Sequence, residues 1–206
     1  MLNEQNSPIV RDKIVKASRN LFIQKGFKGT TVRDIAAASG TNVAMVNYYF
    51  RSKHNLFNEI FEEVFDTLAK KIFLAIDSDL PFFEMIKKWV YSYYDTLSEF
   101  PQLPIFLMNE LNQNPRSLQE RLMSRNLNKI YSKLAKRISE EEEKGTIKET
   151  SVTNFILNLV SLSVFPFVFQ PVAIAFLNMT KEEYDELSKD HKEYVVEFII
   201  NAIKKN

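Results

Sequence analysis

Apolar residues recur at steps of three and four along most of the chain, which is the spacing of helices that bury one face. Near the N-terminus this pattern predicts three short helices, over residues 7–26, 30–40 and 42–49. Serine, threonine and asparagine stand at their starts as helix caps, and Gly26 and Gly40 end the first two. The pattern therefore predicts a small helical bundle.

A fourth, longer helix is predicted from Lys53, with apolar residues on two adjacent ridges that can pack against two neighbours. Proline and glycine divide the rest of the chain into further helices. These cover roughly residues 82–100, 103–112, 116–144, 152–165, 167–177 and 181–205. We therefore predict an all-α fold, with a helix-turn-helix domain at 1–52 joined by the long helix to a helical domain at 53–206.

The composition narrows the class of protein. Only four glycines occur in 206 residues, which disfavours a turn-rich sheet protein. The absence of cysteine excludes disulfides and thiolate metal sites, and with no signal peptide expected it fits a cytoplasmic protein. Residues 1–60 hold nine Lys/Arg against four Asp/Glu, whereas the remainder is slightly acidic. The charge therefore favours DNA as a partner of the N-terminal part alone.

Helix, glycine-containing turn and helix can together present a short helix to the major groove of DNA. The start of the second predicted helix offers amides and hydroxyls to a phosphate, and the third offers an amide and apolar atoms to base edges. A plain helical bundle has the same spacing, so the spacing alone leaves a structural role open. The predicted DNA-contacting residues are Thr30, Thr31, Arg33, Asn42, Val43, Ala44, Met45, Asn47, Tyr48, Tyr49 and Lys53, the last two through phosphates.

Several motifs occur in order in this region: Gly26-Phe27, TTVRDIA at residues 30–36, Gly40, and VNYYFRSK at residues 46–53. Together they resemble the DNA-binding domain of the TetR family, over roughly residues 8–68. The resemblance implies a ligand-responsive repressor that reads a palindromic operator as a homodimer, with a helical C-terminal domain that dimerises and holds the effector. Asn47 stands where many members have tyrosine, so we expect Tyr49 to make that phosphate contact.

The second half of the chain is rich in aromatic residues that could line an apolar effector pocket. Aromatic residues at helical spacing also fit an ordinary core, and the sequence leaves both interpretations open. The predicted effector is a small apolar or aromatic molecule. The candidate pocket residues are Trp89, Tyr93, Tyr94, Phe106, Met108, Asn109, Tyr131, Phe165 and Phe169.

The last two apolar regions, residues 152–177 and 181–205, carry more apolar surface than one short chain can cover. We therefore predict that they pack against their copies in a second chain as a four-helix arrangement. The predicted dimer-interface residues are Phe155, Leu159, Leu162, Tyr184, Leu187, His191, Tyr194, Val195 and Phe198.

Two other interpretations stay open at this point. Residues 155–177 carry no charge and are long enough to cross a bilayer, but two prolines and several polar side chains interrupt them, so no membrane partner is predicted. The other alternative is a helical enzyme or ligand-binding protein that keeps its helix-turn-helix for packing. Glutamates 140–143 point around a helix, and His54 and His191 lie far apart in the sequence. We therefore expect no metal, cofactor or catalytic site.

Overall fold

The computed structural model describes residues 7–113, 115–116, 120, 123 and 127–205. The chain divides into two compact units, residues 1–66 and residues 67–206. Helix α4 (Lys53–Ile76) contributes its first part to one unit and its last part to the other. The described residues are helical throughout both units and contain no strand beyond a single bridge between Ile147 and Lys204. The predicted all-α fold is confirmed.

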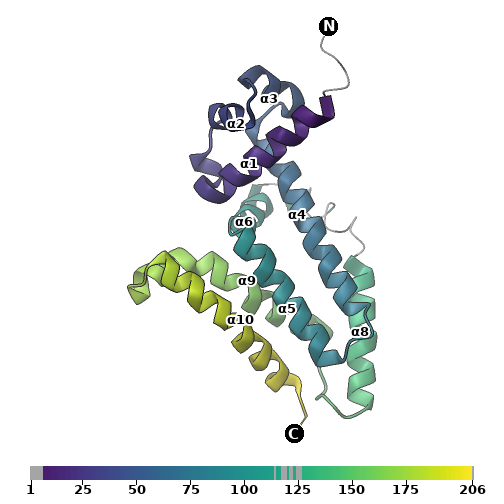
Figure 1. Cartoon of the computed structure of the whole chain (residues 1–206). Helices are drawn as coiled ribbons and strands as arrows, with labels where there is room; N and C mark the ends of the chain where they lie inside the picture. The colour runs from purple at the N-terminus through teal and green to yellow at the C-terminus, as the bar shows by residue number, and fades with distance from the viewer. Residues whose placement is uncertain (1–6, 114, 117–119, 121–122, 124–126, 206) are drawn as a thin grey trace. The chain divides into compact units, whose positions relative to one another are not determined.

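The first unit contains α1 (Ser7–Gly29), α2 (Val32–Ser39), α3 (Val43–Phe50) and the start of α4 (Figure 1). The backbone of α1 leaves helical geometry at Gly26, with φ 69° and ψ 172°, where the sequence predicts the helix to end. Gly40 closes α2 in the left-handed conformation (φ 66°), which a residue without Cβ adopts at no steric cost. The glycines therefore set the corners of the helix-turn-helix.

The core of the first unit takes one side chain or more from every helix. Ile14, Ile35, Val46 and Leu56, from α1, α2, α3 and α4 respectively, are almost fully buried together. Such close packing fixes the rotation of each short helix about its own axis. The faces of α2 and α3 that remain outside the core are therefore determined by the apolar pattern.

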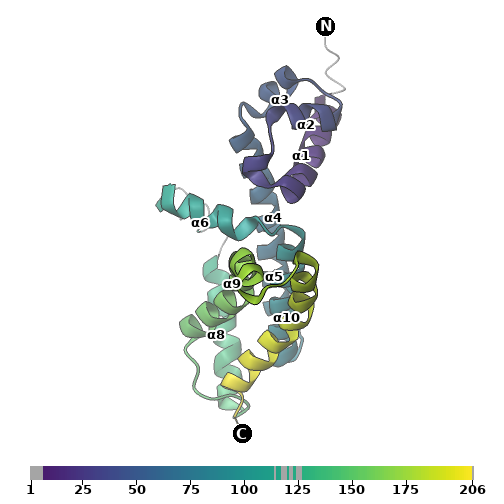
Figure 2. The ribbon, with the colours of Figure 1, turned by 90° about the vertical axis from the view of Figure 1, so that its left-hand side faces the viewer.

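The second unit contains the rest of α4, α5 (Phe82–Glu99), α6 (Leu103–Gln113), α8 (Leu127–Glu143), α9 (Val152–Leu177) and α10 (Lys181–Ile203). Helices α9 and α10 run side by side, and both pack against α5 (Figures 1 and 2). The first part of the helix predicted over residues 116–144 falls largely outside the described residues.

Helix α9 corrects one expectation. The sequence predicts a break at Pro166, but the structure forms a single helix that contains Pro166 and Pro171. Each proline lacks an N–H and removes one helical hydrogen bond, which normally ends a helix. Packing of α9 against α5, α6, α8 and α10 holds it together across both prolines. The hydroxyl of Tyr184 on α10 also donates to the carbonyl of Pro166 at 2.8 Å.

Candidate nucleic-acid interface

Helix α3 has one face in the core and one face in solvent. Val46 and Phe50 are buried, while Met45 and Tyr49 are half-buried. Tyr48 leaves 78% of its surface exposed, and its ring meets that of Tyr49 edge to face at 5.2 Å. The exposed residues of the predicted set on this helix and its cap are Asn42, Val43, Ala44, Asn47 and Tyr48. Together they present amide, phenol and small apolar groups on one surface.

The start of α2 is fixed by a reciprocal capping box. The backbone N–H of Thr31 donates to the Asp34 carboxylate at 2.8 Å, and the N–H of Asp34 donates to the Thr31 hydroxyl at 3.1 Å. These bonds from the Thr31 backbone and hydroxyl lower the pKa of Asp34 below its ordinary value, so the carboxylate stays ionised. Arg33, one residue before it, is exposed. The helix start is therefore ordered and carries a cation at the surface.

Thr30 does not lie at the surface, contrary to the prediction that it contacts DNA. Its side chain is 0% exposed, and its hydroxyl donates to the carbonyls of Gly26 at 2.8 Å and Leu21 at 3.2 Å. Both carbonyls belong to the last turns of α1, around the bend at Gly26. Thr30 therefore joins the end of α1 to the start of α2 within the unit.

Lys53 also has partners that the sequence does not reveal. Its ammonium donates to the carbonyls of Phe27 at 2.7 Å and Thr30 at 2.8 Å, and it lies 4.2 Å from the centre of the Phe27 ring. The predicted phosphate contact would compete with these bonds. The local sequence could not show them, because the acceptors lie 26 and 23 residues away.

Several acidic side chains of the first unit are neutralised by ion pairs. Arg11 pairs with Glu59 at 2.5 Å, and Arg19 with Glu63 at 2.6 Å.

Sequence reasoning missed two exposed cations next to the predicted surface, which have no ion-pair partner among the described residues. They are Lys28, just before α2, and Arg51, just after α3, which adopts a positive φ of 62°. The only sequence signal for either is its position in a turn between short helices.

The predicted effector-pocket residues lie in different environments. Trp89, Tyr94 and Phe106 are buried in the second unit, and Tyr93 is half-buried, with burial raising the pKa of its phenol to about 12. Phe165 and Phe169 instead stack on each other at 5.2 Å on the exposed side of α9. Three further members of the set are exposed, namely Met108, Asn109 and Tyr131.

A hollow of about 530 Å³ does lie in the second unit, but other residues line it. Its walls include Lys71, Leu74, Lys88 and Tyr91 and come from the end of α4 and from α5. None of the predicted pocket residues belongs to its lining. The sequence could not separate core from pocket here, because both use aromatic residues at helical spacing.

The predicted dimer-interface residues lie in three environments: some are buried, some half-buried and some exposed. Phe155, Leu159, Tyr184 and Val195 are buried against their own chain, so the structure corrects their assignment to an intermolecular surface. The Phe155 ring lies 6.3 Å from that of Trp89 on α5, and the Tyr184 hydroxyl donates to the Pro166 carbonyl of α9. Leu162 and His191 are half-buried, and the Nδ1 atom of His191 lies 2.7 Å from the Tyr94 hydroxyl. The remaining residues, Leu187, Tyr194 and Phe198, are exposed along α10.

Among the described residues, α9 is the one helix long and apolar enough to cross a membrane, judged by length and composition alone. Its exposed apolar side chains include Leu157, Phe165, Val172 and Phe176, the last with 82% of its surface in solvent. Large exposed apolar surfaces on proteins usually mark sites that contact another protein, a ligand or a membrane.

Comparison with known proteins supplies the family. A model described as "Bacterial regulatory proteins, tetR family" matches residues 14–60, the region that holds α2 and α3. The chain is also 30% identical over 167 residues to YttP of Bacillus subtilis (strain 168), a probable HTH-type transcriptional regulator, and the match covers 80% of each protein. The chain belongs to the TetR family.

The similarity to other relatives of this TetR-family protein extends over both units. The chain is 24% identical over 165 residues to NicS, an HTH-type transcriptional repressor of Pseudomonas putida, covering 78% of this chain and 77% of NicS. A TetR/AcrR-family regulator from Thermobifida fusca has the same fold, with a TM-score of 0.63, 18% identity and coverage of 90% and 96% of the two chains. HlyIIR, a hemolysin II transcriptional regulator, matches with a TM-score of 0.55 at 22% identity, covering 97% and 99%. As a member of the TetR family, the protein is a transcriptional regulator.

Proposed function

We propose that this regulator binds an operator through the exposed face of α3, with the start of α2 and nearby cations on the phosphates. The observation that carries the proposal is the division of α3 into a buried side, Val46 and Phe50, and an exposed polar side that includes Asn47 and Tyr48. The major groove admits one helix, and its base edges accept and donate hydrogen bonds that an amide can match. Arg33, Lys28 and Thr31 would add contacts to the phosphates.

The purified protein can be tested against a pool of random duplexes, with bound fragments recovered over several rounds. The proposal predicts enrichment of one motif composed of two inverted half-sites, because a symmetric dimer presents two identical recognition helices. Recovery of unrelated sequences, or of no DNA at low salt, would contradict it. A regulator that retains the helix-turn-helix only for packing would give that second result.

We infer that the protein works as a homodimer joined through α9 and α10. The support is exposed apolar surface on both helices, Leu187, Tyr194 and Phe198 on α10 and Phe165 and Phe176 on α9. Burial of apolar surface contributes about 25 cal/mol per Å² to the stability of a complex. Burying this surface against the same surface of a second copy is therefore favourable. Lipid would be the alternative cover. Sedimentation of a dimer in detergent-free buffer supports the proposal and a cytoplasmic protein, whereas recovery only with detergent would favour the membrane.

We propose repression, relieved by a small apolar or aromatic effector that binds in the second unit. Two hydroxyls of the second unit, those of Thr96 on α5 and Ser163 on α9, are buried and have no hydrogen-bond partner among the described residues. A buried hydroxyl without a partner is costly, so a ligand group that bonds to it would be favoured. A named repressor, NicS, is among the relatives.

The effector proposal can be tested by adding a panel of phenols and aromatic acids to a labelled operator complex and following fluorescence anisotropy. Release by one member of the panel, lost in Ser163→Phe but retained in an exposed control such as Ser161→Phe, would support a site between α5 and α9. Equal release in both variants would place the site elsewhere.

A further inference from the structure

The ammonium of Lys53 contacts three groups within the first unit. An ammonium has three N–H donors. Two of them reach the carbonyls of Phe27, at 2.7 Å, and Thr30, at 2.8 Å, and the group lies 4.2 Å from the centre of the Phe27 ring, which takes the third side. The residue as a whole is half-buried. A phosphate could gain a bond from Lys53 only if one of these partners were released.

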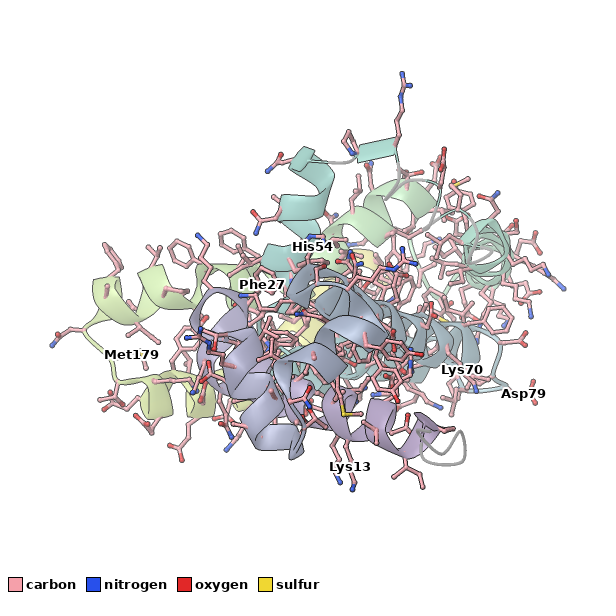
Figure 3. The ribbon with its side chains drawn as sticks, turned by 90° about the horizontal axis from the view of Figure 1, so that it is seen from above. Lys13, Phe27, His54, Lys70, Asp79 and Met179 are labelled. Carbon is pink, nitrogen blue, oxygen red and sulfur yellow. The ribbon has the colours of Figure 1, made fainter. Side chains whose placement is uncertain are left out.

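The atoms that Lys53 binds lie in the segment that leads into α2. Phe27 follows the bend at Gly26, and Thr30 immediately precedes Thr31, the N-cap of α2. The same segment is held from inside by the Thr30 hydroxyl, which donates to the Gly26 carbonyl. Phe27 itself packs edge to face against Phe57 at 5.0 Å and against His54 at 6.1 Å, and Phe27 and His54 lie near each other in Figure 3. Lys53 thus connects the first turn of α4 to the entrance of α2.

Releasing these bonds to reach DNA would be unfavourable. The Phe27 and Thr30 carbonyls are part-buried where they accept from the ammonium, and an acceptor that loses a charged donor in such a place loses one of the stronger classes of hydrogen bond. Lys28, in contrast, lies in the same segment, is exposed and has no ion-pair partner among the described residues. Of the two lysines, Lys53 is therefore engaged within the unit, whereas Lys28 is available at the surface.

We propose that Lys53 is a positioning residue for DNA binding and not a phosphate contact. It fixes residues 27–30, so that Thr31, Arg33 and the amides at the start of α2 are held in place before DNA arrives. Lys28 supplies the phosphate contact that the sequence assigns to Lys53. This inference rests on the proposed DNA binding, but the state of the Lys53 ammonium in the free protein can be measured without DNA.

Amine labelling of the unmodified protein tests the proposal. The native chain is treated briefly with acetic anhydride, alone and with a short mixed-sequence duplex at low salt, and the label on each lysine is measured by mass spectrometry. We expect Lys53 to be labelled slowly in both samples. Lys28 should react freely without DNA and be protected when DNA is added, whereas Lys13, which extends away from the ribbon in Figure 3, gives the rate for a solvated lysine.

Two outcomes overturn the assignment. One is rapid labelling of Lys53 in free protein, at the rate of Lys13, with protection on adding DNA. The other is a lower salt dependence of DNA binding in Lys53→Met, since the loss of one phosphate contact reduces the slope of log K against log salt by about 0.9. We expect that loss of slope in Lys28→Met, while Lys53→Met weakens binding equally at every salt concentration. If DNA protects no lysine, the proposed DNA binding fails, and the free-protein rate still decides the state of Lys53.

Discussion

Asn47 is the residue of α3 whose chemistry is best suited to reading a base. Its amide is exposed beside Tyr48, and an asparagine amide can pair with the N6 and N7 edge of adenine. We expect Asn47→Ala to reduce discrimination at one base pair of each half-site by about 1–3 kcal/mol. Binding to the selected operator and to its single-base variants measures this. A loss that is equal on operator and random DNA would assign Asn47 to the phosphates instead.

Most of the α3 side chains that the sequence predicts to contact DNA are exposed, because the buried positions Val46 and Phe50 determine the rotation of the helix. The sequence did not predict the partners of Thr30 and Lys53. A threonine before a helix and a lysine at the start of one have the same local pattern whether they bind phosphate or a carbonyl of their own chain. The carbonyls that Lys53 binds lie 26 and 23 positions away in the sequence. No local sequence signal therefore shows that Lys53 binds its own chain.

At the element scale, α2 depends on its capping box. Loss of an N-cap hydroxyl costs about 1 kcal/mol, so Thr31→Ala should lower the free energy of unfolding by that amount in a urea titration. It should also weaken DNA binding, because the start of α2 loosens. Thr180→Ala is the matched control, since Thr180 and Glu183 form the same box at the start of α10. A similar loss of DNA affinity in both variants would show that the capping box of α2 has no specific role in DNA binding.

The same capping box gives a pH dependence with a definite sign. Hydrogen bonds from Thr31 hold the pKa of Asp34 below the ordinary value of 3.8. Its stabilising effect is therefore complete above pH 3.8 and is lost as the pH falls through the lower folded-state pKa. Urea titrations of wild type and Asp34→Asn across the acidic range should show a difference in stability that shrinks toward low pH. A difference that stays constant would contradict the assignment.

Helix α9 shows why element boundaries are harder to predict than elements. Proline is a strong local signal for a helix end, and the sequence predicts a break at Pro166. The structure keeps one helix, because α9 packs against four other helices and the bonds lost to proline are a small part of what holds it. Propensity is overridden here by tertiary packing.

For the whole molecule, the sequence predicted the excess of apolar surface on α9 and α10. It did not predict which of these apolar residues are buried within the chain and which are exposed. Periodicity cannot tell a side chain buried in its own chain, such as Val195, from one left in solvent, such as Phe198. The same limit applies to the predicted effector-pocket residues. Trp89 and Phe165 are both aromatic residues at helical spacing, but Trp89 is buried and Phe165 is exposed.

The exposed stripe on α10 gives a test of the proposed dimer. Phe198 is 65% exposed, so Phe198→Glu leaves the fold of the chain intact but places a charge in the proposed seam. We expect monomers by light scattering, unchanged helix content by circular dichroism, and loss of operator binding in a gel shift. Lys189→Glu, an exposed position on the opposite side of α10, should stay dimeric. A Phe198→Glu protein that remains a dimer and binds normally would exclude α10 from the interface.

Hydroxyl-radical footprinting on the selected operator tests the central claim, that two copies of this chain read DNA through paired helix-turn-helix units. We expect two protected patches related by two-fold symmetry, with centres about one helical turn apart or slightly more, roughly 34–40 Å. Asn47→Ala should weaken both patches together, because the two recognition helices are identical. A single protected patch, or two patches on half-sites that are not inverted copies, would exclude binding by a symmetric dimer.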